Sequence, residues 1–259
     1  MKTLNLRVIG YPAFGIVLLL VIWQMYVVMF HVPIAVLPTP TQIAQSFVDD
    51  RAALLSQGWV TLLECVYGFA LAFIVGVPIA FAIANSPILN RMFYPLLIAM
   101  QSVPKVALAP IVLVWLGTGI ESKLALVWLV AFFPIVVDTA TGLRTTPVNL
   151  IELATSLRAT RMQIFLKIQM PAALPHVISG AKIAVTLAVI GAVIGEFVGS
   201  TEGLGNLLLV ANSQLNTPLA FAALISLALL GLLLYLAIAA IEFALRPWLP
   251  HTAEMAGAI

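Results

Sequence analysis

The sequence has very few charged residues and almost no cysteine. Only 8% of its 259 residues are Asp, Glu, Lys or Arg, against about 25% in an average soluble domain. Hydrophobic residues make up 63%, and the mean hydropathy is +1.14. The one cysteine, Cys65, excludes an intrachain disulfide and is expected to be a small buried residue. These scarcities exclude an ordinary soluble domain and a disulfide-stabilised one.

The chain also lacks the patterns of an ATPase, an enzyme or a metal site. It contains no G-x-x-x-x-G-K-[ST] phosphate loop. His31, His176 and His251 are isolated and show no metal-ligand spacing, and no Ser, His and acid set is arranged for nucleophilic catalysis. The basic residues are dispersed, and the formal net charge is only +2. We therefore expect no catalytic residues, no bound metal or cofactor, and no nucleic-acid partner.

What the sequence does contain is a series of apolar runs near the length of a helix that crosses roughly 30 Å of hydrocarbon. The runs lack the alternation of transmembrane β-strands. They predict an all-α polytopic membrane protein, a bundle of six transmembrane helices. The third span is expected to be interrupted at Pro104 and Pro110, because proline removes a backbone donor. The predicted spans are Tyr11–Phe30, Trp59–Ala84, Tyr94–Leu116, Leu124–Thr141, Val177–Val198 and Leu219–Leu245.

The basic residues between the spans fall mostly on one side. The first span is expected to stay uncleaved, because its apolar run is longer than a signal-peptide core. With the N-terminus inside, only Arg51 and Lys123 fall on the outer side. The positive-inside rule then predicts a multi-pass protein of the bacterial inner membrane with both termini in the cytoplasm. The inner side receives Lys2, Arg7, Arg91, Arg144, Arg158, Arg161, Lys167 and Arg246.

Three parts follow from this layout. Residues 1–58 are predicted to hold a transmembrane helix and an extracytoplasmic amphipathic segment, in which Thr39 caps a short helix beginning at Pro40. Residues 59–246 form a five-helix core, and residues 247–259 form a tail.

A polar-bearing stretch of residues 146–175, called the elbow below, connects the fourth and fifth spans on the cytoplasmic side. Thr146 is expected to cap its first helix, with Pro147 at the first helical position. A second helical segment is expected after Thr160, with Pro171 and Pro175 at its end. Such an elbow either enters a groove on another protein or lies on the lipid surface. One apolar stripe on its first helix contains Leu150, Leu153, Ala154 and Leu157.

The elbow resembles the EAA loop of ABC-importer permeases. That loop reads E-A-A, a glycine, and I-x-L-P, and the chain has Glu152-Leu153-Ala154 and then Ile168-Gln169-Met170-Pro171. Arg158 stands at the usual glycine position, which is a departure that affects the expected bend. Two further blocks, 103–123 and 195–224, resemble permeases of the nitrate/sulfonate/taurine group. The resemblance covers the chain from about residue 37 to its C-terminus.

The resemblance implies a MetI-like permease fold with a cytoplasmic coupling helix. It implies a homodimer, two copies of a cytoplasmic ABC ATPase that bind ATP and magnesium, and an extracytoplasmic substrate-binding protein. The solute would be an organic anion, such as a sulfonate, nitrate or a carboxylate, or a small heteroaromatic such as a pyrimidine vitamin precursor. The residues expected to contact the ATPase are Glu152, Leu153, Ala154, Leu157, Arg158, Arg161 and Pro171.

Charged residues inside the apolar runs are candidates for the translocation path, because a charge at mid-bilayer costs about 2.5–3.5 kcal/mol. Lys105 either attracts an anionic solute or pairs with a carboxylate of a neighbouring span. Gln101 and Ser102 beside it offer polar contacts to a solute. Glu196 lies among glycines, either at a dimer or gate interface or in plain helix packing with its carboxylate reaching for water. The remaining charges are Glu64, Asp138, Lys182 and Glu242.

Two other functions remain open on the residues alone. One is a secondary transporter or channel that works without an ATPase. The other is a membrane scaffold whose elbow recruits a soluble partner.

Overall fold

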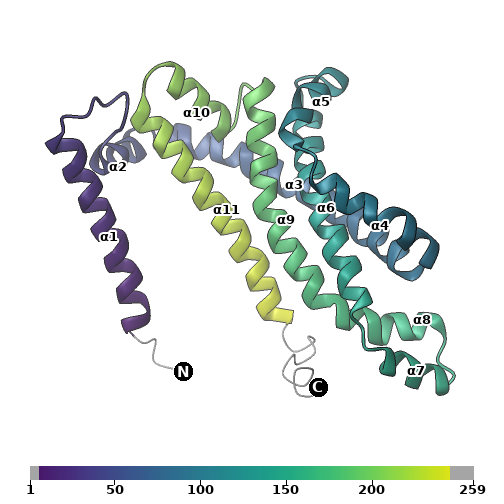
Figure 1. The fold of residues 1–259 in the computed structure, drawn as a ribbon. Helices are drawn as coiled ribbons and strands as arrows, with labels where there is room; N and C mark the ends of the chain where they lie inside the picture. The colour runs from purple at the N-terminus through teal and green to yellow at the C-terminus, as the bar shows by residue number, and fades with distance from the viewer. Residues whose placement is uncertain (1–5, 246–259) are drawn as a thin grey trace.

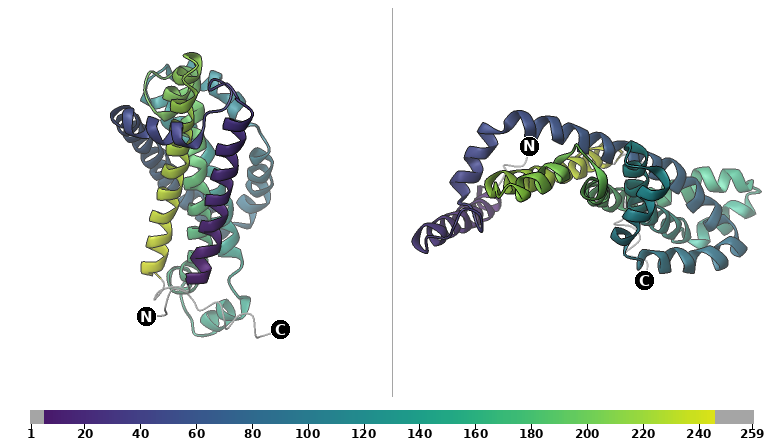
Figure 2. Two further views of the ribbon diagram at one scale, coloured as in Figure 1. Left: turned by 90° about the vertical axis from the view of Figure 1, so that its left-hand side faces the viewer. Right: turned by 90° about the horizontal axis from the view of Figure 1, so that it is seen from above.

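The structure, a computed structural model, describes residues 6–245, and its regular elements in this range are all helical. The long helices stand side by side (Figure 1), and seen from above they form a thin, curved layer and not a closed bundle (Figure 2). The elements are α1 Leu6–Met29, α2 Pro40–Asp49, α3 Arg51–Asn85, α4 Pro87–Gln101, the 3-10 turn η1 Lys105–Leu108, α5 Ala109–Leu116, α6 Ile120–Arg144, α7 Val148–Ser156, α8 Arg161–Ile164, the π-helical turn η2 Phe165–Gln169, α9 Met170–Gly199, α10 Leu204–Ser213 and α11 Thr217–Leu245.

Among the described residues, four helical segments are long and apolar enough to cross a membrane. They are α3, α6, the continuous stretch Arg161–Gly199, and α11. Pro87–Gln101 and Lys105–Leu116 make a fifth if this pair, bent by 91°, counts as one span. Helix α1 adds a shorter apolar stretch, Phe14–Met29. The all-α polytopic prediction is therefore confirmed.

The break in the third predicted span occurs at one of the two prolines that were predicted to interrupt it. Pro104 is extended, with ψ 95°, and the chain resumes as a 3-10 turn at Lys105. Pro110 does not interrupt a helix, because it lies in the first turn of α5, where the missing N–H would have had no helical partner. The predicted interruption is therefore correct at Pro104 and wrong at Pro110.

Helices α6 and α9 pack closely along each other, flanked by α3 and α11. A methyl group added at Gly191 would lie 2.8 Å from the Cα of Val127, and one at Gly195 would lie 3.3 Å from the Cα of Lys123. These glycines therefore allow two helix backbones of the same chain to approach. Of the two roles left open for them, the structure supports helix packing within the chain.

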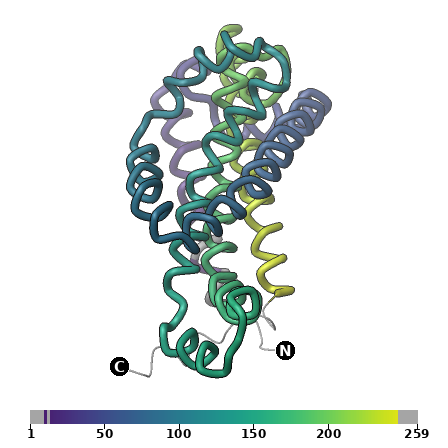
Figure 3. Tube along the Cα trace, turned by 90° about the vertical axis from the view of Figure 1, so that its right-hand side faces the viewer, coloured from purple at the N-terminus to yellow at the C-terminus, as the bar shows by residue number. Residues whose placement is uncertain are grey.

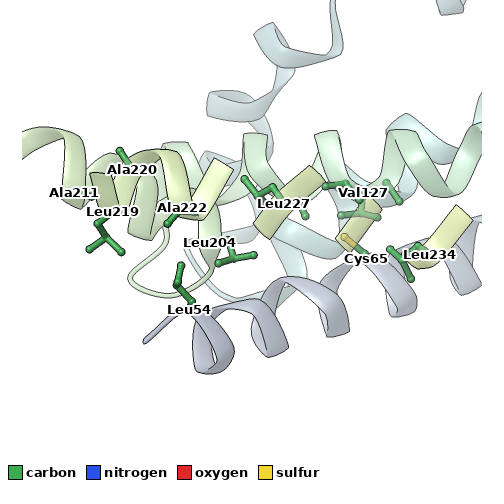
Figure 4. Packing of buried hydrophobic residues seen from close by; sticks show 14 of the residues in the cluster. Leu54, Cys65, Val127, Leu204, Ala211, Leu219, Ala220, Ala222, Leu227 and Leu234 are labelled. Carbon is green, nitrogen blue, oxygen red and sulfur yellow. The ribbon is translucent and has the colours of Figure 1, made fainter. Parts of the chain in front are cut away.

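Helix α10 folds back against the neighbouring spans and shares one hydrophobic core with them (Figure 4). Leu204 and Ala211 of α10 are buried there with Leu54 and Cys65 of α3 and Leu227 of α11. Cys65 is fully buried, as predicted.

The two ends of the layer differ. The start of α1, the end of α11 and the helices α7 and α8 lie at one end, here called the elbow end (Figures 1 and 2). Helices α2, α5 and α10 lie at the other, here called the α10 end. At the α10 end the predicted cap of α2 is confirmed, because the Thr39 hydroxyl accepts from the Gln42 N–H at 3.2 Å and the Gln42 side chain accepts from the Thr39 N–H at 2.9 Å.

Two observations relate to the predicted division of the chain into three parts. Helix α3 begins at Arg51, so the second span starts within the segment assigned to the N-terminal part. The tail at 247–259 lies outside the described residues. The division itself stays a prediction.

Candidate functional site

The elbow projects beyond the ends of the long helices (Figure 3). Its first helix, α7, begins at Val148, with Pro147 and not Thr146 at the N-cap. The Thr146 hydroxyl donates to the Leu143 carbonyl at 3.0 Å and is therefore used by the end of α6. The predicted Thr146 cap is wrong for this reason.

Arg158 forms the bend between the two elbow helices. Its φ is +56°, the left-handed region that glycine usually occupies. The Ala159 N–H donates to the Ala154 carbonyl at 3.0 Å, and the Arg158 N–H donates to the Thr155 carbonyl at 2.9 Å. This is the Schellman pattern of helix ends. The bend therefore stays at the position where the EAA loop has glycine, and arginine adopts the glycine conformation.

The second half of the elbow runs without interruption into α9. Thr160 caps α8 by exchanging hydrogen bonds with Gln163 at 3.3 and 2.8 Å. A π-helical turn follows, in which the Met170 N–H donates to the Phe165 carbonyl five residues earlier. Pro171 lies directly after this turn, where the hydrogen-bond register has already shifted and its missing N–H is tolerated. The prediction that prolines end the second elbow segment is therefore wrong.

The apolar stripe of α7 is exposed at three of its four positions. Leu150, Leu153 and Leu157 are 46%, 57% and 75% exposed, whereas Ala154 is buried. Exposed leucines on a segment that projects from the layer form a surface suited to contact with another molecule. Of the other residues predicted to contact the ATPase, Glu152, Arg158 and Arg161 are exposed and Pro171 is partly buried.

At the α10 end, α3, α6 and α9 enclose a buried polar cluster of Glu64, Lys123 and Glu196 with Thr61. Lys123 Nζ lies 2.8 Å from Glu64 Oε1, and the two side chains are only 11% and 1% exposed. Lys123 was counted above as a loop residue marking the outer side, and it is instead a buried ion-pair partner. Glu196 is 1% exposed, so the interpretation that its carboxylate reaches for water is also wrong.

This cluster holds the start of α10. The Thr61 hydroxyl donates to Glu196 Oε1 at 2.7 Å and accepts from the Leu204 N–H at 2.9 Å. The Gly205 N–H donates to Glu196 Oε2, and the Gly203 N–H donates to Gln57 Oε1 at 2.6 Å. The first amides of α10, which a helix leaves without partners, are thus satisfied by side chains of α3 and α9.

Gly203 cannot be replaced without strain. Its φ of +103° is in a region that side chains disfavour, and a Cβ there would fall on the Glu196 carboxyl group. The Gly203-Leu204-Gly205 sequence is therefore explained by the close approach of backbone amides to a carboxylate.

Lys105 lies at the break between α4 and η1. Its Nζ donates to the Gln101 carbonyl at 3.2 Å and lies 5.4 Å from the centroid of the Phe133 ring. Within residues 6–245 it has no carboxylate in ion-pair contact, so the structural ion pair left open above is not found in this part of the chain. Gln101 and Ser102 are exposed beside it. Glu196, the fourth residue predicted for the path, belongs to the buried cluster.

A second ion pair, between Lys182 of α9 and Glu242 of α11, was missed by the sequence analysis. The two side chains are 20% and 35% exposed. Asp138, another of the charged residues within the apolar runs, is partly buried where α6 packs against Gly180 of α9.

The elbow and the broken span both lie within a region shared with known transport proteins. Residues 72–247 match the family described as binding-protein-dependent transport system inner membrane component. The chain belongs to this family. It is thus a permease subunit of a binding-protein-dependent ABC importer, a multi-pass inner-membrane protein without catalytic activity of its own. Membership also implies ATPase and binding-protein partners, which decides against a carrier that works alone.

Individual relatives agree with this assignment. The permease is 37% identical over 238 residues to the formylaminopyrimidine transport permease of Halalkalibacterium halodurans, covering 92% of this chain and 95% of that protein. It is 28% identical over 241 residues to the taurine transport permease of Escherichia coli, covering 90% and 86%. The predicted resemblance to the taurine group is confirmed.

The fold is also found in a solved transporter. A chain of the inward-facing MetNI methionine ABC transporter superposes with a TM-score of 0.66 at 24% identity, covering 75% of this permease and 96% of that chain. The predicted MetI-like fold is therefore confirmed.

The two ion pairs should differ in their effect on stability. We expect Lys123→Met to destabilise the permease by roughly 3–5 kcal/mol, because it leaves Glu64 buried without its cation. The matched variant Lys182→Met should cost about 1 kcal/mol or less, because its partner is partly exposed. Thermal unfolding of the detergent-purified proteins measures both, and equal shifts in Tm would contradict the assignment of the buried cluster.

Proposed function

We propose that the elbow docks this permease onto a cytoplasmic ABC ATPase, and that two permease copies form a homodimer with two ATPase copies. The observation that carries this proposal is the exposure of Leu153 and Leu157 on a helix that projects from the layer. A helix with such leucines fits a groove on a partner. ATP and magnesium would be bound by the ATPase, since this chain has no phosphate loop.

The proposed topology has six spans, with α1 as the first and both termini in the cytoplasm. Three observations support it. Helix α1 is 24 residues long, enough to cross roughly 30 Å of hydrocarbon. The start of α1 and the end of α11 lie at the elbow end. The exposed Arg158 and Arg161 also lie there, as the positive-inside rule requires of a cytoplasmic face.

The proposed solute is a small organic anion or heteroaromatic compound, delivered by a substrate-binding protein. Lys105 supports an anion, because its ammonium group lies at the broken span with no carboxylate partner in the described residues. The irregular backbone beside it also supports a path, since such backbone is tolerated at membrane depth where it is buried or lines a cavity. The relative named for formylaminopyrimidine transport supports a heteroaromatic compound.

Motion of the elbow would couple ATP hydrolysis to transport. Because α8, η2 and α9 form one continuous helical stretch, a displacement of the elbow by the ATPase is transmitted along α9. Helix α6 packs along α9, so both would tilt together and alternate the access of the path between the two sides of the membrane.

Reversing the charge of Glu152 tests the docking surface. We expect Glu152→Lys to abolish co-purification of the ATPase that accompanies the wild-type permease from native membranes, because an acid on the rim of the apolar stripe becomes a base. Insertion into the membrane should be unchanged. Glu121→Lys, at an exposed acid of the α10 end, is the control, and normal ATPase recovery with Glu152→Lys would refute the proposal.

Arg158 allows the docking role and the backbone role to be separated. Arg158→Gly should raise the stability of the permease by about 1 kcal/mol, because it relieves the left-handed conformation of a non-glycine residue. It should also weaken ATPase binding on the order of tenfold, or about 1.4 kcal/mol, because the guanidinium is lost. Arg158→Ala, which removes the guanidinium and keeps the strain, should weaken binding equally without the gain in Tm. Unchanged or tighter binding of the Gly variant would exclude a contact by Arg158.

Lys105 provides the test of an anionic solute. In proteoliposomes containing the permease, its ATPase and its binding protein, Lys105→Met should lower the initial uptake rate about tenfold if the ammonium group contributes about 1.4 kcal/mol. Lys105→Arg should retain most of the rate, because the charge stays. Arg91→Met, at an exposed position of α4 outside the elbow, is the control for a general loss of positive charge, and full uptake by Lys105→Met would remove the support for an anion.

A further inference from the structure

The buried cluster at the α10 end contains more acidic than basic groups. Glu64 and Glu196 are each 1% exposed, and Lys123 is the one cation in ion-pair contact with either among the described residues. The neighbouring groups are Glu202 on the loop before α10, which adds a further acid, and the Cys65 thiol. With both carboxyl groups ionised, the cluster would carry one uncompensated negative charge away from water, which is strongly unfavourable.

The hydrogen bonds of the cluster indicate which carboxyl oxygen could carry a proton. Both oxygens of Glu196 accept a hydrogen bond, and Glu64 Oε1 accepts one from Lys123. Glu64 Oε2 is buried and has no donor. Thr61, which donates to Glu196, lies three residues before Glu64 on the same face of α3, so the two carboxyl groups are neighbours in the cluster. A proton on Glu64 Oε2 would turn this atom into a donor to Glu196, and every oxygen of the pair would then have a partner.

We propose that Glu64, Lys123 and Glu196 form a proton-binding site that holds α10 against the spans. With one proton bound, one carboxylate balances one ammonium group and the site is neutral. Loss of the proton to water leaves two carboxylates beside one ammonium group. Their repulsion favours an arrangement in which water reaches Glu196, and the bonds from Thr61 and Gly205 to this carboxylate are then broken.

The consequence is that attachment of α10 depends on pH. Helix α10 should stay packed against the neighbouring spans at low pH and should detach from them as the pH rises. Its location on the outer side of the membrane, where the binding protein delivers the solute, rests on the topology proposed above. The proton site itself rests only on the contacts of the cluster.

A buried thiol on α10 can report the opening. The native thiol is removed with Cys65→Ala, and Ala211→Cys places a new one on α10 at a position with no exposed surface (Figure 4). A water-soluble maleimide would react with this thiol only when α10 moves. The measurement uses the purified full-length permease at a series of pH values.

Two variants remove the proton site while keeping the cluster neutral. Glu64→Gln and Glu196→Gln each leave one carboxylate with one ammonium group, so neither needs an additional proton. The parent of this comparison is the protein with Cys65→Ala and Ala211→Cys. The intrinsic reactivity of the thiol at position 211 rises with pH in the parent and in the variants alike. Dividing the labelling rate of the parent by that of a variant removes this common rise. The rate in the parent divided by the rate in either variant should be about one at low pH and about tenfold or more at high pH, which corresponds to about 1.36 kcal/mol of opening.

Two further variants complete the test. Glu242→Gln, in the ion pair of α9 and α11, should give the parent's pH dependence. The double variant Glu64→Gln/Glu196→Gln should label rapidly at all pH values, because Lys123 is then buried without a counter-ion.

A ratio of labelling rates, parent to single variant, that does not change with pH overturns the proposal. The failure of both single variants to fold also overturns it, since each should leave a neutral cluster. Because the assay involves no ATPase and no solute, its failure leaves the proposed function untouched.

Discussion

The structure depends on one constraint: polar groups that are buried in a membrane must find their partners inside the protein. The spans meet it as helices. Where a helix starts at the α10 end inside the packed layer, its free amides are satisfied by Gln57, Thr61 and Glu196 of neighbouring helices. Where the chain projects from the layer at the elbow, local caps suffice, and leucines are left exposed. The two ends of the permease therefore differ because their surroundings differ.

Much of this architecture could be predicted from local sequence signals. Long apolar runs located the spans, Pro104 within the third predicted span located the break, and Thr39 with Pro40 located the start of α2. The EAA-like loop and two neighbouring blocks indicated the family, which the comparison confirms. These features are readable because each depends on residues that are close together in the chain.

The wrong predictions and the contacts that were not predicted depend on residues far apart in the chain or on the hydrogen bonds of the surrounding structure. Lys123 and Glu64 are 59 positions apart, and Thr61 and Glu196 are 135 apart, so no local pattern pairs them. Thr146 matched a cap rule but is used by the preceding helix, and Pro171 matched a helix-ending rule but follows a π-helical turn. In each case a contact or hydrogen-bond register set by the surrounding structure overrode a local preference.

The central claim is that this permease moves its solute only with energy supplied through the elbow by a separate ATPase. Its most direct test is uptake into proteoliposomes reconstituted with the permease, its co-purifying ATPase and the cognate binding protein. The account predicts accumulation of the binding protein's ligand that requires ATP, the ATPase and the binding protein together. Accumulation by the permease alone, driven by a proton or sodium gradient, would contradict it.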